Sequence, residues 1–384
     1  MVPGRDAFTF RALLIQGAVI AAIIALFVFI GSNFVANAER LNIHTGFAFL
    51  NRRAGFDMTL KLVPFTEDST YLDTLWVALT NTILVALLSC IGASVLGLFV
   101  GLGRLSTNKV IAGVATAYVE TVRNIPLLLQ LFYWYFGVLA VLPNPRQSLS
   151  LFHLIFLNKR GLVMPAPVGE PGLRWFLAAL VAGIVVWSLC SRVAKRRRVE
   201  TGQESPLRHV GPATLLVLVV AAIAATGWPI AWDVPKLGGF NFQGGMVIIP
   251  ELVAMTWALS LYGAAFIGEL VRGSIKSVPP GQMEAGLSLG LPKWRVYAFI
   301  VLPQALRALV PPLGNQYIVI LKNSSLGTAI AYPDLMLVWS GTVLNSTGQP
   351  LEVMFLLMLC YLCMCLLIAL GANALNKRIQ LVER

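Results

Sequence analysis

The amino-acid sequence predicts an all-α, polytopic membrane protein. Of its 384 residues, 57% are hydrophobic and only 12% are charged, which is typical of a membrane protein rather than of soluble domains. About eight apolar stretches are long enough, or nearly so, to cross a hydrocarbon core of about 30 Å. A spanning segment must satisfy its backbone hydrogen bonds internally, so each stretch should be a helix. They cover approximately residues 12–31, 77–102, 125–142, 173–192, 212–230, 247–271, 299–321 and 352–371.

The first stretch is expected to remain in the protein as a membrane anchor. A cleaved signal peptide is the alternative, because Arg5 and Arg11 precede the stretch and Ala36-Asn37-Ala38 resembles a cleavage site. The apolar run Ala12–Ile30 is longer than the hydrophobic region of a signal peptide, which has about 7 to 15 residues. The seventh stretch is the weakest of the eight because it contains several prolines and polar residues, so we expect it to be kinked and packed against other helices.

The distribution of basic residues predicts that both termini are cytoplasmic. Of 29 Lys and Arg residues, 18 fall in the segments 1–11, 103–111, 192–211, 272–307 and 372–384. Only 10 fall in the segments 32–76, 143–174, 231–248 and 322–351. Positive charge favours the cytoplasmic side, so the net charge of +12 indicates orientation in a bilayer rather than binding of nucleic acid. Lys195–Arg198 is the strongest marker, and contact with anionic lipid is its alternative role.

Several kinds of chemistry are not supported by the sequence. The segment nearest to a phosphate-binding loop, Gly273–Ser277, lacks the second glycine that lets a backbone wrap phosphates. The three histidines stand far apart, and the five cysteines lie in apolar runs, so neither a metal site nor a disulfide framework is expected. We therefore expect that the chain does not hydrolyse ATP itself and holds no cofactor.

The loop that follows the sixth stretch, 281–303, contains two short helices joined by a tight turn. Pro279 and Pro280 end the preceding helix, and Gly290 with Pro292 forms the turn. Small residues at Ala285, Gly286 and Gly290 would let the surface of a partner approach the backbone. Periodicity alone leaves an amphipathic helix on the membrane surface as an equal alternative.

The spacing of this loop resembles a known motif. Glu284-Ala285-Gly286, three residues, Gly290, nine residues and then Ile300-Val301-Leu302-Pro303 is similar to the EAA motif of ATP-binding-cassette (ABC) importer permeases. The one departure is Gly286, where that family has alanine. The resemblance implies a type I ABC importer permease fold. It also implies that the loop, which begins at Gly281, is a coupling helix seated in a groove of a separate cytoplasmic ATP-binding subunit.

Three further segments narrow the resemblance. Glu120–Gln130, Gly268–Gly273 and Leu321–Leu326 resemble blocks of polar amino acid permeases of the histidine and glutamine class. The core of the resemblance covers 70–142 and 246–384. An additional helix and outer segment (1–69) and a two-helix insertion (143–245) resemble the Q-type subunit of the general L-amino acid permease, or its glutamate, glutamine, aspartate and asparagine counterpart.

Polar residues in or beside the spans are candidates for a substrate path. Glu120 with Arg123, and Glu269 with Arg272, are each three residues apart, so each pair can form a local ion pair on a helix. The other polar residues either line an amino acid path or hydrogen-bond one helix to another. They are Gln130, Asn315, Gln316, Lys322, Asn323 and Ser325.

The resemblance implies a multi-pass permease subunit in the bacterial inner membrane that translocates amino acids. Its expected partners are an ATP-binding subunit acting as a dimer, a second and related permease subunit, a periplasmic amino-acid-binding protein and the lipid bilayer. A homodimer of permease chains is an alternative to the pair of related chains. An ion-coupled secondary amino acid transporter is the rival function, although such transporters favour carboxylates at the membrane midplane.

Overall fold

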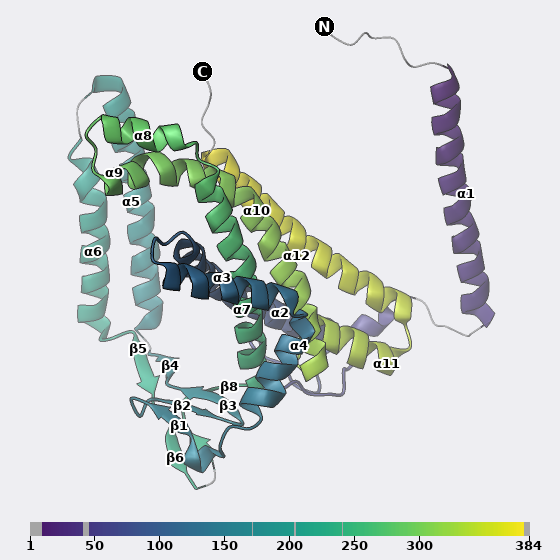
Figure 1. Cartoon of the computed structure of the whole chain (residues 1–384). Helices are drawn as coiled ribbons and strands as arrows, with labels where there is room; N and C mark the ends of the chain where they lie inside the picture. Colours follow the sequence, from purple (N-terminus) through teal and green to yellow (C-terminus); the bar gives the residue numbers. More distant parts are fainter. Residues whose placement is uncertain (1–9, 41–45, 171, 203–204, 240, 380–384) are drawn as a thin grey trace. The chain divides into compact units, whose positions relative to one another are not determined.

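The computed structural model describes residues 10–40, 46–170, 172–202, 205–239 and 241–379. It is mostly helical and has two compact units, which are residues 1–127 with 259–384, and residues 128–258. Within the described residues, seven helices are long and apolar enough to cross a membrane. Two helices labelled in Figure 1, α4 (Leu127–Phe132) and α7 (Pro250–Lys276), contain residues of both units.

The first unit is helical throughout its described elements. They are α1 (Phe10–Arg40), η1 (Phe47–Asn51), α2 (Tyr71–Arg104), α3 (Lys109–Asn124), α8 (Pro280–Ser288), α9 (Lys293–Val296), η4 (Tyr297–Val301), α10 (Leu302–Asn323), η5 (Ser324–Ile330), η6 (Leu337–Val343), α11 (Leu344–Thr347) and α12 (Pro350–Ile379). Two of them, η4 and η6, are π-helices.

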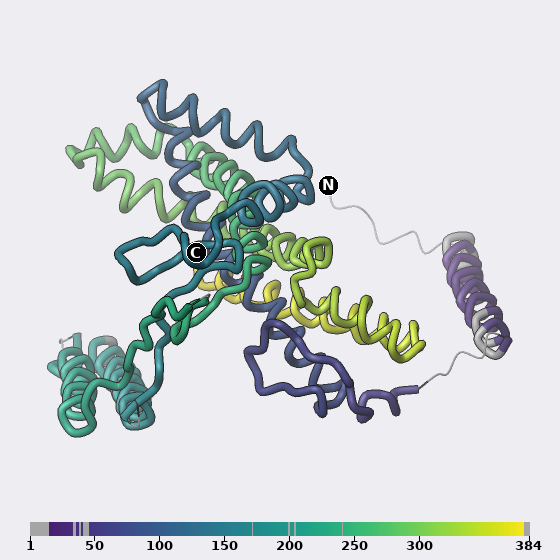
Figure 2. The backbone as a smooth tube through the Cα atoms, turned by 90° about the horizontal axis from the view of Figure 1, so that it is seen from below, coloured from purple at the N-terminus to yellow at the C-terminus, as the bar shows by residue number. Residues whose placement is uncertain are grey.

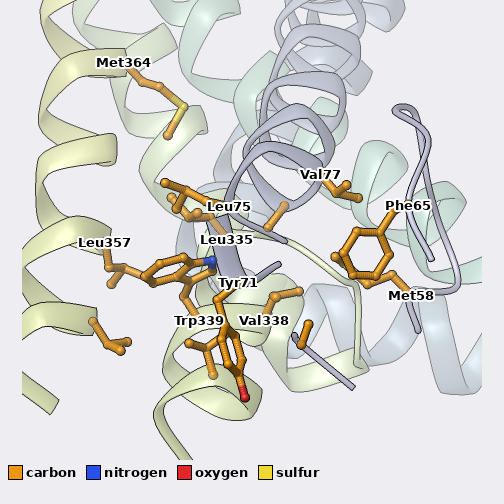
Figure 3. Close-up of a cluster of buried hydrophobic side chains, with 14 of the residues drawn as sticks. Met58, Phe65, Tyr71, Leu75, Val77, Leu335, Val338, Trp339, Leu357 and Met364 are labelled. Carbon is orange, nitrogen blue, oxygen red and sulfur yellow. The ribbon is translucent and has the colours of Figure 1, made fainter. Parts of the chain in front are cut away.

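The largest hydrophobic core lies where η1, α2, η6 and α12 meet. Trp339 is fully buried at its centre, with Leu357 of α12 and Tyr71 of α2 around it (Figure 3). The Phe49 ring lies 6.3 Å from the Trp339 ring and 6.0 Å from the Tyr71 ring, which are distances typical of interacting aromatic pairs. This core fixes the segment between α10 and α12.

Polar contacts hold the same segment against α2. The buried Asn81 amide donates to the carbonyl oxygens of Leu60, at 3.0 Å, and Pro333, at 2.9 Å. The Thr82 hydroxyl accepts from the Leu335 N–H at 2.9 Å. Asp334, between these contacts, is also fully buried. Buried polar groups need partners, and here they anchor a turn on the first third of α2, a long apolar helix.

Small residues let α2 approach α7 closely. A Cβ atom at Gly101 would lie 2.7 Å from the carbonyl oxygen of Gly268, and one at Gly97 would lie 2.8 Å from the Ile267 side chain. Two glycines four residues apart therefore form the contact face, as is common where membrane helices pack without large side chains. Beside this contact, Ile267, Val271 and Ile320 form a second hydrophobic cluster with Ala93.

The second unit combines a helix pair with short strands. The helices α5 (Leu173–Thr201) and α6 (Leu207–Thr226) lie side by side (Figure 2). The other elements are η2 (Tyr133–Leu139), η3 (Pro145–Gln147), β1 (Leu149–Leu151), β2 (Ile155–Asn158), β3 (Gly161–Met164), β4 (Ala166–Gly169), β5 (Ile230–Asp233), β6 (Lys236–Gly238), β7 (Asn241–Gln243) and β8 (Met246–Ile248).

The strands form three small antiparallel sheets. Their orders are β1-β2-β3-β8, β4-β5 and β6-β7. The β4-β5 pair joins the start of α5 to the end of α6, because Gly169 is opposite Ile230. The prediction of an all-α chain is therefore wrong for 143–174 and 231–248. Strands of three or four residues are stabilised by pairing between distant segments, which local hydropathy does not reveal.

The prediction of eight spanning helices is also only partly correct. Residues 125–142 form no long helix, because α3 ends at Asn124 and a shorter apolar helical segment covers Leu127–Leu139. Pro126 explains the break, since it has no N–H to donate and disfavours helical geometry at Ile125 before it. The last part of this segment, η2, is a π-helix.

Candidate functional site

The helix α8 ends in a turn that requires a glycine. The N–H of Leu291 donates to the Gly286 carbonyl at 3.3 Å, and the N–H of Gly290 donates to the Leu287 carbonyl at 2.9 Å. These two bonds define a Schellman motif, whose αL residue is usually glycine. Gly290 has a φ angle of +74°, so the glycine of the expected motif is explained by the backbone conformation of the turn.

Gly286 faces its own chain rather than a partner. It is buried, and a Cβ atom there would lie 2.8 Å from Cδ1 of Ile300 and 3.1 Å from Cγ2 of Val296. The expectation that Gly286 opens the loop to an approaching partner is therefore wrong. Its small size instead lets α8 lie flat on α9 and η4. The contact of Gly286 with Ile300 joins the first part of the motif to its last part.

The outer face of α8 is exposed and mixed in chemistry. Glu284, Ala285 and Gly290 are exposed, and Leu289 at the turn is 79% exposed. Within the described residues the Glu284 carboxylate makes no hydrogen bond or ion pair. Trp294 is 62% exposed at the adjoining helix. An unpaired carboxylate beside large exposed apolar groups is typical of a surface that a protein partner covers.

The remaining motif residues connect this surface to α10. Leu302 is exposed, Ile300 and Pro303 are half-buried, and Gly281 is exposed at the start of α8. Pro303 lies in the first turn of α10, which continues directly from the π-helix η4. A cavity of about 770 Å³ lies between the end of α2, the end of α7 and the η4–α10 segment, and Leu302 is among its lining residues.

A cluster of charged residues joins the ends of α2, α3 and α7. The Glu269 carboxylate accepts from Arg272, with Nε at 3.0 Å, and from Arg104. Glu120 lies 3.9 Å from the Arg104 guanidinium, and Arg123 lies over the Phe266 ring. The Glu269–Arg272 pair is thus confirmed. The expected Glu120–Arg123 pair is wrong, because each of these residues has another neighbour.

Arg104 is a member of this charged cluster that sequence reasoning missed. It is 165 residues from Glu269 in the chain, and its side chain is only 12% exposed. The sequence marks it only as one basic residue among several near a helix end. Its pairing with Glu269 depends on the close packing of α2 on α7, which local spacing does not predict.

The candidate path residues of α10 do not form one site with this cluster. Tyr317 on α10 shares a hydrogen bond with Ser94 on α2, 2.8 Å apart, whereas Arg104 lies ten residues further along α2. At about 1.5 Å per residue, this is a difference of about 15 Å in depth. The charged cluster and the polar part of α10 are therefore at different levels of the helix bundle.

The polar residues of α10 differ in burial. Gln316 is half-buried, and its Nε2 atom is buried without a partner among the described residues. Asn315 and Lys322 are exposed, while Asn323 and Ser325 are half-buried. The Ser325 hydroxyl donates to the Lys322 carbonyl at 2.7 Å. Gln130 is half-buried on α4, in the other unit. Of the group, only Gln316 offers a buried donor without a partner.

Comparison with known proteins identifies related chains. A family model described as "Binding-protein-dependent transport system inner membrane component" matches residues 93–381. The putative amino-acid ABC transporter permease protein YhdX of Escherichia coli is 45% identical, over 98% of this chain and 96% of the relative. The general L-amino acid transport system permease protein AapQ of Rhizobium johnstonii is 42% identical, over 98% and 94%. The glutamate/glutamine/aspartate/asparagine transport system permease protein BztB of Rhodobacter capsulatus is 35% identical, over 98% and 95%.

Proposed function

The chain belongs to the family of binding-protein-dependent transport system inner-membrane components, and we propose on this premise that its α8–η4 segment couples transport to ATP hydrolysis. The protein is the non-catalytic, multi-pass permease component of an amino acid ABC importer of the inner membrane. Family membership excludes the ion-coupled secondary transporter as a rival. Membership also implies an ATP-binding subunit and a binding protein as partners.

The observation that carries the proposal is the combination of a rigid inner face and an unpaired outer face on α8. The Gly286 contact seats α8 on Val296 and Ile300, and the Schellman turn fixes its end. The exposed outer face carries Glu284 and Leu289. A partner that moves this face must therefore move η4 and α10 with it, because packed interfaces shift as units rather than compress.

We further propose that the assembly contains two ATP-binding subunits and a second, related permease chain. The chain has one segment with the motif spacing, 281–303. One such surface would engage one ATP-binding subunit of a dimer, so a second permease would supply the other surface.

With α8 on the cytoplasmic side, the distribution of basic residues supports cytoplasmic termini. Reporters fused after Arg198 and after Gly239 should lie inside and outside, respectively, and the reverse result would contradict this topology.

The substrate is proposed to be an L-amino acid that passes α10. The printed functions of two relatives, general L-amino acid transport and glutamate/glutamine/aspartate/asparagine transport, support this class. The buried Gln316 amide, which lacks a partner among the described residues, could donate to a polar group of the substrate. Asn315, Lys322 and Asn323 are the other polar candidates of α10, and Ser325 follows them in η5.

The coupling proposal is tested by reversing the chemistry of the outer face. The double variant Glu284→Arg/Leu289→Asp changes two exposed side chains and leaves the Gly286 contact in place. We expect co-purification of the ATP-binding subunit to fall at least about tenfold, which corresponds to about 1.4 kcal/mol, and ATP-dependent uptake into vesicles to fall with it. The matched control is Glu170→Arg, an exposed charge reversal outside the loop. Normal association and uptake in the double variant would refute the proposal.

A further inference from the structure

The end of α5 carries a groove that combines apolar and basic residues. The groove has a volume of about 560 Å³ and is lined by Leu189, Val193, Arg192, Lys195, Arg196 and Glu200. Five of these six residues, at 189, 192, 193, 196 and 200, follow the three- and four-residue spacing of one helix face. Leu189 comes first along the helix, Arg192 and Val193 are adjacent, and Lys195 and Arg196 follow toward the tip of the α5–α6 pair.

The length of α5 places this change of chemistry at the membrane boundary. Its 29 residues extend about 43 Å at 1.5 Å per residue, whereas the hydrocarbon core is about 30 Å thick. About twenty residues from Leu173 reach the region of Val193. Leu189 and Val193 therefore lie at the edge of the hydrocarbon, and Lys195 and Arg196 lie at the depth of lipid headgroups. Arg192, at the level of Val193, reaches the headgroups through its long side chain.

The basic residues of the groove lack a protein partner. Within the described part of the chain, Arg192, Lys195 and Arg196 are exposed and make no hydrogen bond or ion pair. Among the described residues that line the groove, one carboxylate, Glu200, faces three basic side chains, so a net positive charge remains on this lining. The helices α5 and α6 are almost entirely exposed, since only 6% of each spanning window is buried within the protein. Lipid is therefore the expected neighbour of this face.

We propose that this groove binds one anionic phospholipid. One acyl chain would lie along Leu189 and Val193, and the phosphodiester would lie between Arg192, Lys195 and Arg196. Guanidinium groups donate to phosphate oxygens with bidentate geometry. A zwitterionic headgroup should bind more weakly than an anionic one, because its own cation competes for the phosphate. The bound lipid would hold the tip of the α5–α6 pair at the headgroup level. This inference rests on the membrane location of the chain and not on the coupling role of α8.

The probe is photoactivatable phosphatidylglycerol in vesicles that contain the assembled transporter. The measurement is the amount of lipid cross-linked to peptides of residues 173–201. We expect labelling of this peptide to fall about 30-fold in Arg192→Gln/Arg196→Gln. That factor corresponds to about 1 kcal/mol for each of two basic residues at the surface. The variant Arg192→Lys/Arg196→Lys keeps the positive charge but loses the bidentate donors, so its labelling should lie between that of the wild type and that of the glutamine variant. The matched control, Lys377→Gln/Arg378→Gln, removes two exposed charges from the end of α12 and should leave labelling of α5 unchanged.

Other outcomes would overturn the proposal. Equal labelling of α5 by photoactivatable phosphatidylcholine would show that the groove does not select an anionic headgroup. Competition by millimolar inorganic phosphate would show a site for free anions instead of a lipid site. Labelling that is unchanged in Arg192→Gln/Arg196→Gln would show that these residues do not hold the headgroup.

Discussion

Substitution of Gly286 tests whether α8 is fixed to η4 by direct packing. A Cβ atom at this position would lie 2.8 Å from Cδ1 of Ile300, and 3.1 and 3.2 Å from the two methyl carbons of Val296. In Gly286→Ala, the gain in helix propensity is about 1 kcal/mol. Moving the end of Ile300 away from its preferred rotamer costs about 0.5–1.5 kcal/mol. These effects nearly cancel, so we expect Gly286→Ala to have nearly wild-type stability and transport.

A larger side chain should have a different effect. Gly286→Leu adds three further carbons to a buried contact, and overpacking costs about 1–3 kcal/mol. We expect α8 to be pushed away from η4, with a lower unfolding temperature of the purified assembly and loss of ATP-dependent uptake. The control for the unfolding temperature is Gly281→Leu in the same helix, because a Cβ atom at Gly281 meets nothing within 4 Å.

A double-mutant cycle then identifies the contact. Ile300→Val removes the Cδ1 atom that lies nearest to the added Cβ. We compare the change in the free energy of unfolding that Gly286→Ala causes in two backgrounds. If the contact governs the effect, this change should be more favourable in the Ile300→Val background than in the wild type, by about 0.5–1 kcal/mol. The reasoning would be refuted if Gly286→Leu and Gly281→Leu had the same unfolding temperature and the same uptake as the wild type.

Three other predictions concern residues outside the loop. Gln316→Leu should raise the KM for uptake about tenfold through loss of one hydrogen bond to substrate, with the ATP-binding subunit still attached; an unchanged KM would remove Gln316 from the path. Glu269→Gln leaves two arginines without their carboxylate and should lower the free energy of unfolding by about 1–3 kcal/mol. This is less than for a fully buried ion pair, because Glu269 is 29% exposed. A denaturation curve that matches the wild type would contradict a stabilising role of the cluster. Burial raises the pKa of Asp334, which lies outside the spanning helices, from 3.8 to about 7. The folded state therefore holds a proton that the unfolded state has lost between these pH values, so stability should fall as pH rises from about 4 to about 7; Asp334→Asn should abolish this slope, and a slope that persists would assign it elsewhere.

The features that the sequence predicts well are those that depend on local residues. Apolar length predicts the helices α2, α5, α6 and α12, because a span is defined by its own composition. The spacing from Glu284 to Pro303 predicts the two short helices and the turn between them. Gly290 is the clearest case, since its left-handed backbone is required by the turn itself.

The features that the sequence does not predict depend on distant residues. The partner of Glu269 is Arg104, on another helix, and their contact requires the glycine face of α2. The short strands of the second unit are stabilised by pairing across the α5–α6 insertion, as in β3 with β8. The orientation of Gly286 toward Ile300 follows from how α8 folds back on η4, and the motif alone does not distinguish an inward-facing from an outward-facing small residue.

The packing around the loop indicates where its movement can be accommodated. The chain connects α8 to α7 on one side, and the Gly286 contact connects it to η4 and α10 on the other. The close approach of Gly101 to Gly268 prevents α2 and α7 from moving nearer to each other. The cavity of about 770 Å³ between these helices and α10 is the open space beside the loop. A displacement of α8 therefore changes the separation of α10 from the α2–α7 pair before it disturbs the packing of α2 on α7. Variants that fill this cavity, such as Ala305→Phe, should impair uptake without weakening attachment of the ATP-binding subunit.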